Sequence, residues 1–88
     1  MKYTVIWQPD AANELARLWL DSTDRQAVAD AANEIDRLLS ENPYDEKYEV
    51  VWGEGAIAVL PLGVDFEVSG HDMKVTVSGI WHIRDESE

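Results

Sequence analysis

Val64-Asp65-Phe66-Glu67-Val68 alternates apolar and acidic residues without a break, and this run decides the fold class. A repeat of two is typical of a strand with one buried face and one face open to solvent. The polar stretch Ser69-Gly70-His71-Asp72 reads as a turn, and residues 74–83 then alternate again. Two alternating runs joined by a short polar turn predict an antiparallel hairpin.

Two helices are predicted upstream, over about residues 9–20 and 25–40. Pro9 suits a first helical position, where its missing N–H costs nothing, and Asn42-Pro43 ends the second helix. The polar break at residues 21–24 is short, so the two helices should form an antiparallel pair. Pairs three residues apart, Glu14 with Arg17 and Glu34 with Arg37, are expected on the solvent faces. The apolar positions at helical spacing are Ala11, Leu15, Leu18 and Trp19, then Val28, Ala31, Ile35, Leu38 and Leu39.

Three further strands are predicted from β-branched and aromatic runs. Residues 3–7 form the first and end at Gln8-Pro9. Residues 49–52 and 56–60 are expected to pair across the turn Gly53-Glu54-Gly55. Pro61 and Gly63 then interrupt the pattern, which indicates a bulge or a sheet edge.

With the paired runs 49–52 and 56–60 taken together as one β element, the order is β-α-α-β-β-β, which predicts an α+β two-layer sandwich with a helical hairpin on one face of a mostly antiparallel sheet. We expect one domain over residues 1–88, with residues 83–88 as an acidic tail. Each helix offers one apolar stripe, so the other sheet face should stay open and hold any site. Parity places Val64, Phe66, Val68, Val75, Val77, Trp81 and Ile83 on the covered face, and Gly63, Asp65, Glu67, Thr76, Ser78, His82 and Arg84 on the open one.

The charge balance restricts the possible partners. Eighteen acidic residues against seven basic ones give a net charge of −11, and no Lys/Arg cluster is present to grip a phosphate backbone or an anionic membrane. The absence of cysteine excludes thiolate sites and disulfides. No signal peptide or membrane span is visible, so a cytoplasmic domain without a cofactor is expected.

Two runs carry a family resemblance: residues 5–15, in which a strand passes through Gln8-Pro9-Asp10 into a helix, and the final hairpin of residues 64–84. With this element order the chain resembles the RelE/ParE superfamily of bacterial type II toxins. The resemblance implies a toxin–antitoxin (plasmid stabilisation) role and an antitoxin partner. Many members of the superfamily cleave messenger RNA in the ribosomal A site, and others inhibit DNA gyrase, so the resemblance makes these the activities to consider.

The chain departs from the family at the positions that handle RNA. Leu62-Gly63 replaces the Tyr-Arg pair that the resemblance leads one to expect, and Ala56 and Ala58 replace alternating arginines. Only His82 and Arg84 match basic residues of the family, and they are the candidate catalytic pair. Each missing electrostatic donor is worth roughly 3–4 kcal/mol of transition-state stabilisation.

Three functions stay open. The first is protein binding, with an antitoxin-like partner whose segment is basic or neutral, and with no nucleic acid bound outside the ribosome. The second is a ribosome-dependent endoribonuclease that uses His82 and Arg84 with Lys47 or Lys74. The third is a stand-alone dimerisation domain. The expected partner surface consists of Ile57, Val59, Asp65, Glu67 and Ile80 on the open face.

Other residues have simpler interpretations. Asp65 and Glu67 with His82 could hold a metal, but outward charges on a half-buried strand are commoner, so no metal is predicted. Trp7, Trp19 and Trp81 are expected in the core, and Trp52, beside the turn Gly53-Glu54-Gly55, is the tryptophan whose exposure stays open. Tyr44 and Tyr48 should pack against the second helix.

Overall fold

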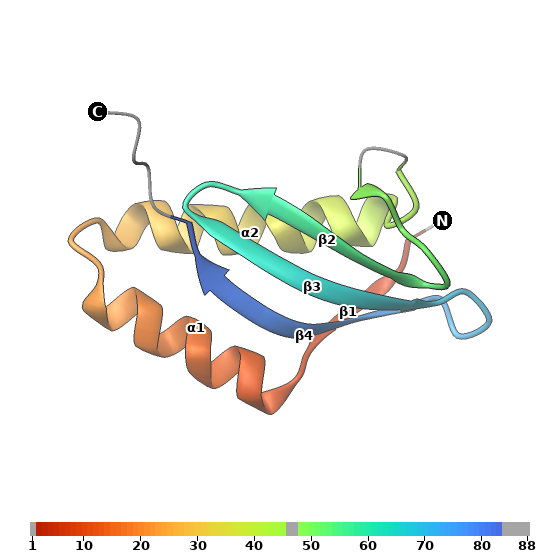
Figure 1. The fold of residues 1–88 in the computed structure, drawn as a ribbon, viewed down its shortest axis with the longest axis horizontal. Coiled ribbons are helices and arrows are strands. Elements are labelled where there is room, and N and C mark those ends of the chain that lie inside the picture. The colour runs from red at the N-terminus through yellow and green to blue at the C-terminus, as the bar shows by residue number, and fades with distance from the viewer. Residues whose placement is uncertain (1, 46–47, 84–88) are drawn as a thin grey trace.

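A computed structural model describes residues 2–45 and 48–83 and places two helices and four strands among them (Figure 1). The order is that expected from the sequence, and the fold is α+β, as predicted. The elements are β1 (Thr4–Trp7), α1 (Pro9–Asp21), α2 (Arg25–Glu41), β2 (Glu54–Val59), β3 (Leu62–Ser69) and β4 (Lys74–His82).

The strands form one sheet in the order β1-β4-β3-β2. The neighbours β2–β3 and β3–β4 are antiparallel, whereas β1 returns beside β4 in parallel after the helical connection. The sheet is therefore mostly antiparallel, as predicted. Its two edges are β1 and β2, and both helices lie on the same side of it (Figure 1).

Local signals explain where the helices begin and end. α1 starts at Pro9, and the side chain of Asp24 caps α2 by accepting a hydrogen bond from the Ala27 N–H at 3.1 Å. Both predicted ion pairs form on the exposed helix surfaces: the Nε atoms of Arg17 and Arg37 donate to Glu14 and Glu34, each at 3.1 Å.

The core lies between α2 and the sheet. Tyr48 adds to it from the connection before β2 and meets the Phe66 ring edge to face at 6.2 Å between centroids. The side chains that are removed from solvent almost completely are Val28, Ile35, Leu39, Leu62, Val64, Phe66, Val75 and Val77. The alternation of β3 and of the first half of β4 is thus confirmed.

The register between β3 and β4 shifts once. Phe66 is opposite Val77, whereas its neighbour Asp65 is opposite Gly79. Ser78 is therefore an extra residue on β4, which makes a β-bulge. Because side chains alternate along a strand, one extra residue exchanges the two faces for everything that follows.

The bulge overturns three placements. Ile80 lies opposite the buried Val64, so its predicted position on the open face is wrong. Trp81 lies opposite Gly63 and is 41% exposed, so its predicted place in the core is wrong as well. His82 lies opposite Leu62 and follows the parity of the covered face, although it is exposed at the end of the strand.

β2 also differs from expectation. It begins at Glu54, and residues 49–52 contribute only a single bridge between Val51 and Glu54 instead of a strand. Ile57 and Val59 are opposite Val64 and Leu62 and belong to the core side, so their predicted open-face position is wrong. Pro61 does not interrupt a strand: the turn at Leu60-Pro61 joins β2 to β3.

The remaining tryptophans differ in how far they are buried. Trp7 packs against the core and donates from Nε1 to Asp36 at 3.4 Å. Trp19 is 39% exposed rather than buried, with the Arg25 guanidinium 4.9 Å from its ring centroid. Trp52, whose exposure the sequence left open, lies at the turn before β2 and is 97% exposed.

No helix in the described ranges is both long enough and apolar enough to cross a membrane.

Candidate functional site

The face of the sheet away from the helices, called the open face here, is where a site was expected. Its centre is built from three rows of side chains that run across β2, β3 and β4. The rows are Glu54, Glu67 and Thr76; Ala56, Asp65 and Gly79; and Ala58, Gly63 and Trp81.

The open face is acidic. Glu54 and Glu67 are direct partners across β2 and β3, and Asp65 lies two residues along β3; all three are exposed. Like charges in such positions repel and destabilise a strand pair. Because Asp65 and Glu67 are exposed and alternate with buried residues of β3, their predicted placement on the open face is correct. Lys74 shares the parity of Thr76 and adds a cationic side chain to this face at the Ser69 end of the hairpin.

Trp81 covers Gly63. A Cβ atom at Gly63 would lie 2.5–2.7 Å from three atoms of the indole ring, which is far inside van der Waals contact. Gly63 is buried for this reason, although its position faces away from the helices. The glycine and the tryptophan are therefore matched to each other, and neither a long nor a charged side chain fits at position 63 unless Trp81 moves.

Two hollows flank β2 and share Tyr48 and Ala56. The first, of about 380 Å³, lies toward the open face and is lined by Tyr48, Glu49, Glu54, Gly55, Ala56 and Asp65. The second, of about 310 Å³, lies toward α2 and is lined by Leu38, Tyr48, Ala56, Ile57 and Ala58. One side of this strand is thus lined with carboxylates, and the other is almost wholly apolar.

Tyr48 stands between these hollows. The side chain is 7% exposed and packs against Phe66, and it lies beside Leu38 of α2, as predicted. Burial raises the pKa of the Tyr48 hydroxyl, and the nearby Asp45 carboxylate raises it further. Tyr44 instead meets Tyr3 edge to face and is 48% exposed.

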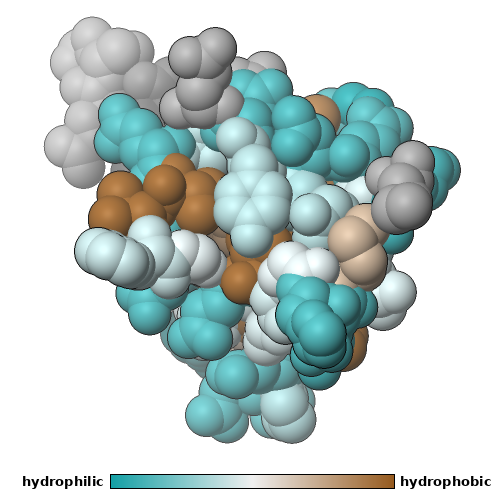
Figure 2. All heavy atoms as spheres, turned by 90° about the vertical axis from the view of Figure 1, so that its right-hand side faces the viewer, coloured by the Kyte–Doolittle hydropathy of each residue, from teal (hydrophilic) through white to brown (hydrophobic). Residues whose placement is uncertain are grey.

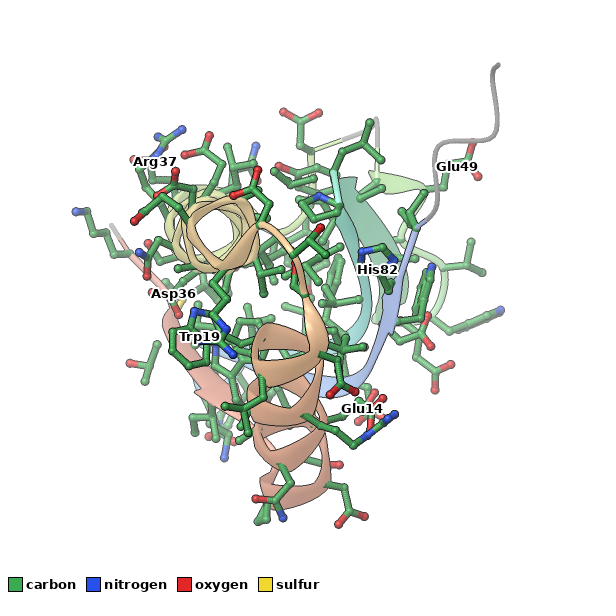
Figure 3. The ribbon with its side chains drawn as sticks, turned by 90° about the vertical axis from the view of Figure 1, so that its left-hand side faces the viewer. Glu14, Trp19, Asp36, Arg37, Glu49 and His82 are labelled. Carbon is green, nitrogen blue, oxygen red and sulfur yellow. The ribbon has the colours of Figure 1, made fainter. Side chains whose placement is uncertain are left out.

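A third hollow, of about 390 Å³, lies between the helices. Its walls are mainly small and apolar, and Trp19 forms one side of it; Figure 3 shows Trp19 on α1. Sequence spacing placed Trp19 in the core because it cannot distinguish a core stripe from an interhelical one. The lining residues are Ala12, Leu15, Ala16, Trp19, Val28, Ala29, Ala32 and Asn33.

The candidate catalytic residues are not gathered into a site in the described ranges. Figure 3 shows His82 at the end of β4, and the register gives it the parity of the covered face, opposite to that of Asp65. Arg84 and Lys47 lie outside the described residues. In residues 2–45 and 48–83, no three His, Cys, Asp or Glu side chains are placed to hold a metal ion.

Apolar side chains also reach the surface at one end of the molecule. Trp52 and Val51, which is 61% exposed, stand there at the turn that leads into β2. Figure 2 shows this end from outside, with hydrophobic side chains at the surface among hydrophilic ones. The sequence left the exposure of Trp52 open and gave no sign of an exposed Val51, since residues 49–52 resembled a strand.

Comparison with known proteins yields no matching family model and no matching curated protein. Solved structures do match. The isolated Escherichia coli RelE toxin in its P21 crystal form superposes with a TM-score of 0.68 at 17% identity, over 97% of this chain and 88% of RelE. The chain has the RelE fold. A free RelE mutant with two arginines replaced by alanine gives a TM-score of 0.69 at 18% identity, over 99% and 88% of the two chains.

The strand pairing shows where the positions that differ from the expected family pattern lie. Ala56, Ala58 and Gly63, where the family resemblance leads one to expect arginines, lie together on the open face: Ala58 is opposite Gly63, and Ala56 is opposite Asp65. The positions expected to be cationic thus form one surface, on which this chain has small residues beside acidic ones.

Proposed function

We propose that this chain is a divergent RelE/ParE-superfamily protein that acts by binding a partner protein, and that it does not cleave RNA. The RelE fold supports the superfamily. The observation that carries the function is the acidic open face. Glu54, Asp65 and Glu67 occupy it, and Trp81 closes position 63 to a cationic side chain.

This surface is poorly suited to RNA. Phosphate binding needs clustered cations, and the carboxylates on the open face would repel the backbone. Phosphoryl transfer also needs positive charge at the developing phosphorane, a contribution of roughly 3–4 kcal/mol per donor. His82 could supply acid–base chemistry, but its register opposite Leu62 gives it the parity of the covered face and not that of the open one.

The same surface suits a positively charged protein segment. Carboxylates steer and hold Lys and Arg, and the partly exposed indole of Trp81 on the same face can add a cation–π contact. A partner of the antitoxin type would therefore present a basic or neutral segment to this chain. A second copy is disfavoured on this face because each chain carries a net charge of −11.

Induced expression in bacteria, alone and with the product of an adjacent small reading frame, tests the proposal. We expect the two proteins to co-purify, and the co-purification to weaken with rising salt. We expect His82→Ala to change neither growth nor binding. Growth arrest that His82→Ala abolishes, with cleaved messenger RNA, would instead establish the endoribonuclease and contradict the proposal.

A further inference from the structure

The outer edge of β1 carries backbone groups that the chain does not use itself. β1 is a terminal strand, and its Thr4 N–H donates inward, on the β4 side, to the Met73 carbonyl at 2.9 Å. Successive residues of a strand direct their N–H and C=O groups alternately to its two sides. Val5 and Trp7 therefore direct theirs outward, and in the described part of the chain these four groups make no hydrogen bond.

The chain limits this edge at both ends. At one end, the N–H of Tyr3 is already used, because it donates to the Ser40 carbonyl of α2 at 2.8 Å. At the other end, α1 begins at Pro9, which has no N–H to donate. A strand that is added to this edge must therefore pair with Val5 and Trp7.

The edge is also free of charge in a chain whose net charge is −11. Natural proteins usually protect an exposed edge with lysine, proline or a bulge, and Thr4–Trp7 contains no lysine, proline or ionisable side chain. Ile6 is 41% exposed there. Lys2 lies before the strand and Asp10 after it, so an antiparallel second copy would bring Lys2 of each chain toward Asp10 of the other.

We propose that two copies of this chain pair through β1 in antiparallel fashion and join their four-stranded sheets into one. One symmetric register uses only the available groups: Val5 of each chain pairs with Trp7 of the other, and Ile6 lies opposite Ile6. A register centred on Val5 would need the N–H of Tyr3, and a register centred on Trp7 would need an N–H from Pro9. This inference goes beyond the proposed function and does not depend on it.

This pairing keeps the two acidic faces apart. Glu67 lies on β3, and the two β3 strands of such a dimer are separated by five strand spacings, which is roughly 24 Å and well beyond the Debye length of about 8 Å at physiological salt. Repulsion between the carboxylates of the two copies is therefore screened. Because the paired segment is short, the dimer should be weak and its population should depend on concentration.

Single cysteines test the register, because the chain has no cysteine of its own. Ile6→Cys places two thiols directly opposite each other, in a pair without backbone hydrogen bonds, where side chains come closest. Thr4→Cys is the matched control on the same side of β1, since its two copies would lie about 13 Å apart. After correction for thiol reactivity, the intermolecular disulfide should form at least about tenfold faster for Ile6→Cys in oxidised glutathione. Equal rates would overturn the register.

Light scattering over a concentration range tests the dimer itself. The mean mass should rise with concentration from that of one chain toward that of two, and a mass that stays at one chain throughout would overturn the inference. Ile6→Lys sets like charges opposite each other and should weaken the dimer at least about tenfold, with part of the loss restored by salt.

Thr4→Lys is the control for this substitution, because the register places Thr4 opposite Gln8 rather than opposite itself. It should change the dimer little, and circular dichroism with urea unfolding checks that both lysine variants fold. A dimer that Ile6→Lys leaves intact would assign self-association to another surface and reject pairing through β1.

Discussion

The two faces of β3 are made from alternate residues of the same strand, yet one is buried in the core and the other is exposed to solvent. Leu62, Val64 and Phe66 are at most 1% exposed beneath the helices. Their neighbours Asp65 and Glu67 stand in solvent beside further carboxylates. The covered face gains free energy from buried apolar area, whereas the open face accepts charge repulsion. The two faces of one strand therefore contribute to stability in opposite directions.

The largest effect should follow from a truncation on the covered face. Phe66→Ala removes a buried ring that packs against Tyr48 and should lower the free energy of unfolding by about 3–5 kcal/mol. Urea unfolding followed by tryptophan fluorescence measures this loss. The neighbouring Asp65→Ala is the matched control and should change stability by no more than about 0.5 kcal/mol. Similar losses for both variants would remove the contrast between the faces.

A smaller loss should follow from filling position 63 on the open face, which Trp81 covers. Gly63→Arg forces its Cβ into the Trp81 ring and should cost about 1–3 kcal/mol. Adding Trp81→Ala should recover most of the cost that the ring imposes, so the two substitutions should be strongly non-additive in a double-mutant cycle. Additive effects would show that the ring does not restrict position 63.

Relief of repulsion on the open face should raise stability. Glu67→Lys turns the Glu54–Glu67 pair into opposite charges and should add about 0.2–1 kcal/mol. The gain should shrink at high salt, because both side chains are exposed. Glu67→Gln, which only removes a charge, should gain less. A gain independent of salt would assign the effect to strand propensity instead of charge.

The smallest effect concerns pH. Burial raises the pKa of Tyr48, so an unfolded tyrosine loses its proton first as the pH rises. The stability that Tyr48 contributes is fully present below about pH 10, the ordinary value, and falls as the pH passes through the raised pKa. Urea unfolding at a series of alkaline pH values should show this fall for the native chain and a weaker one for Tyr48→Phe.

Much of the fold could be predicted because apolar spacing and helix boundaries are local signals. Pro9 and Asn42-Pro43 mark helix ends, and the alternation of Val64–Val68 marks a half-buried strand. The extra residue at Ser78 has no such mark, because nothing in its own sequence shows what lies opposite it. The exchange of Ile80 and Trp81 followed from that single residue.

Part of the candidate site could be predicted because it lies in a run with regular alternation. Asp65 and Glu67 belong to a regular run, and both lie on the open face. The faces of Ile57 and Val59 depend on the register of β2 against β3, which sequence parity cannot supply across a turn at Leu60-Pro61. Trp81 reached the open face only through the bulge. Contacts set by pairing between strands are thus the part that a single sequence leaves undetermined.

The fit of Trp81 over Gly63 also limits which sequences can descend from this one. A lineage that acquired an arginine at position 63 first would have to pass through a destabilised intermediate, since the indole already occupies the space of its Cβ. An arginine at position 63 avoids this loss of stability only when a smaller residue has already replaced Trp81. The order of substitutions, and not only their identity, therefore governs whether a cation can appear at the centre of this face. The effect of an arginine at position 63 on stability therefore depends on which residue occupies position 81.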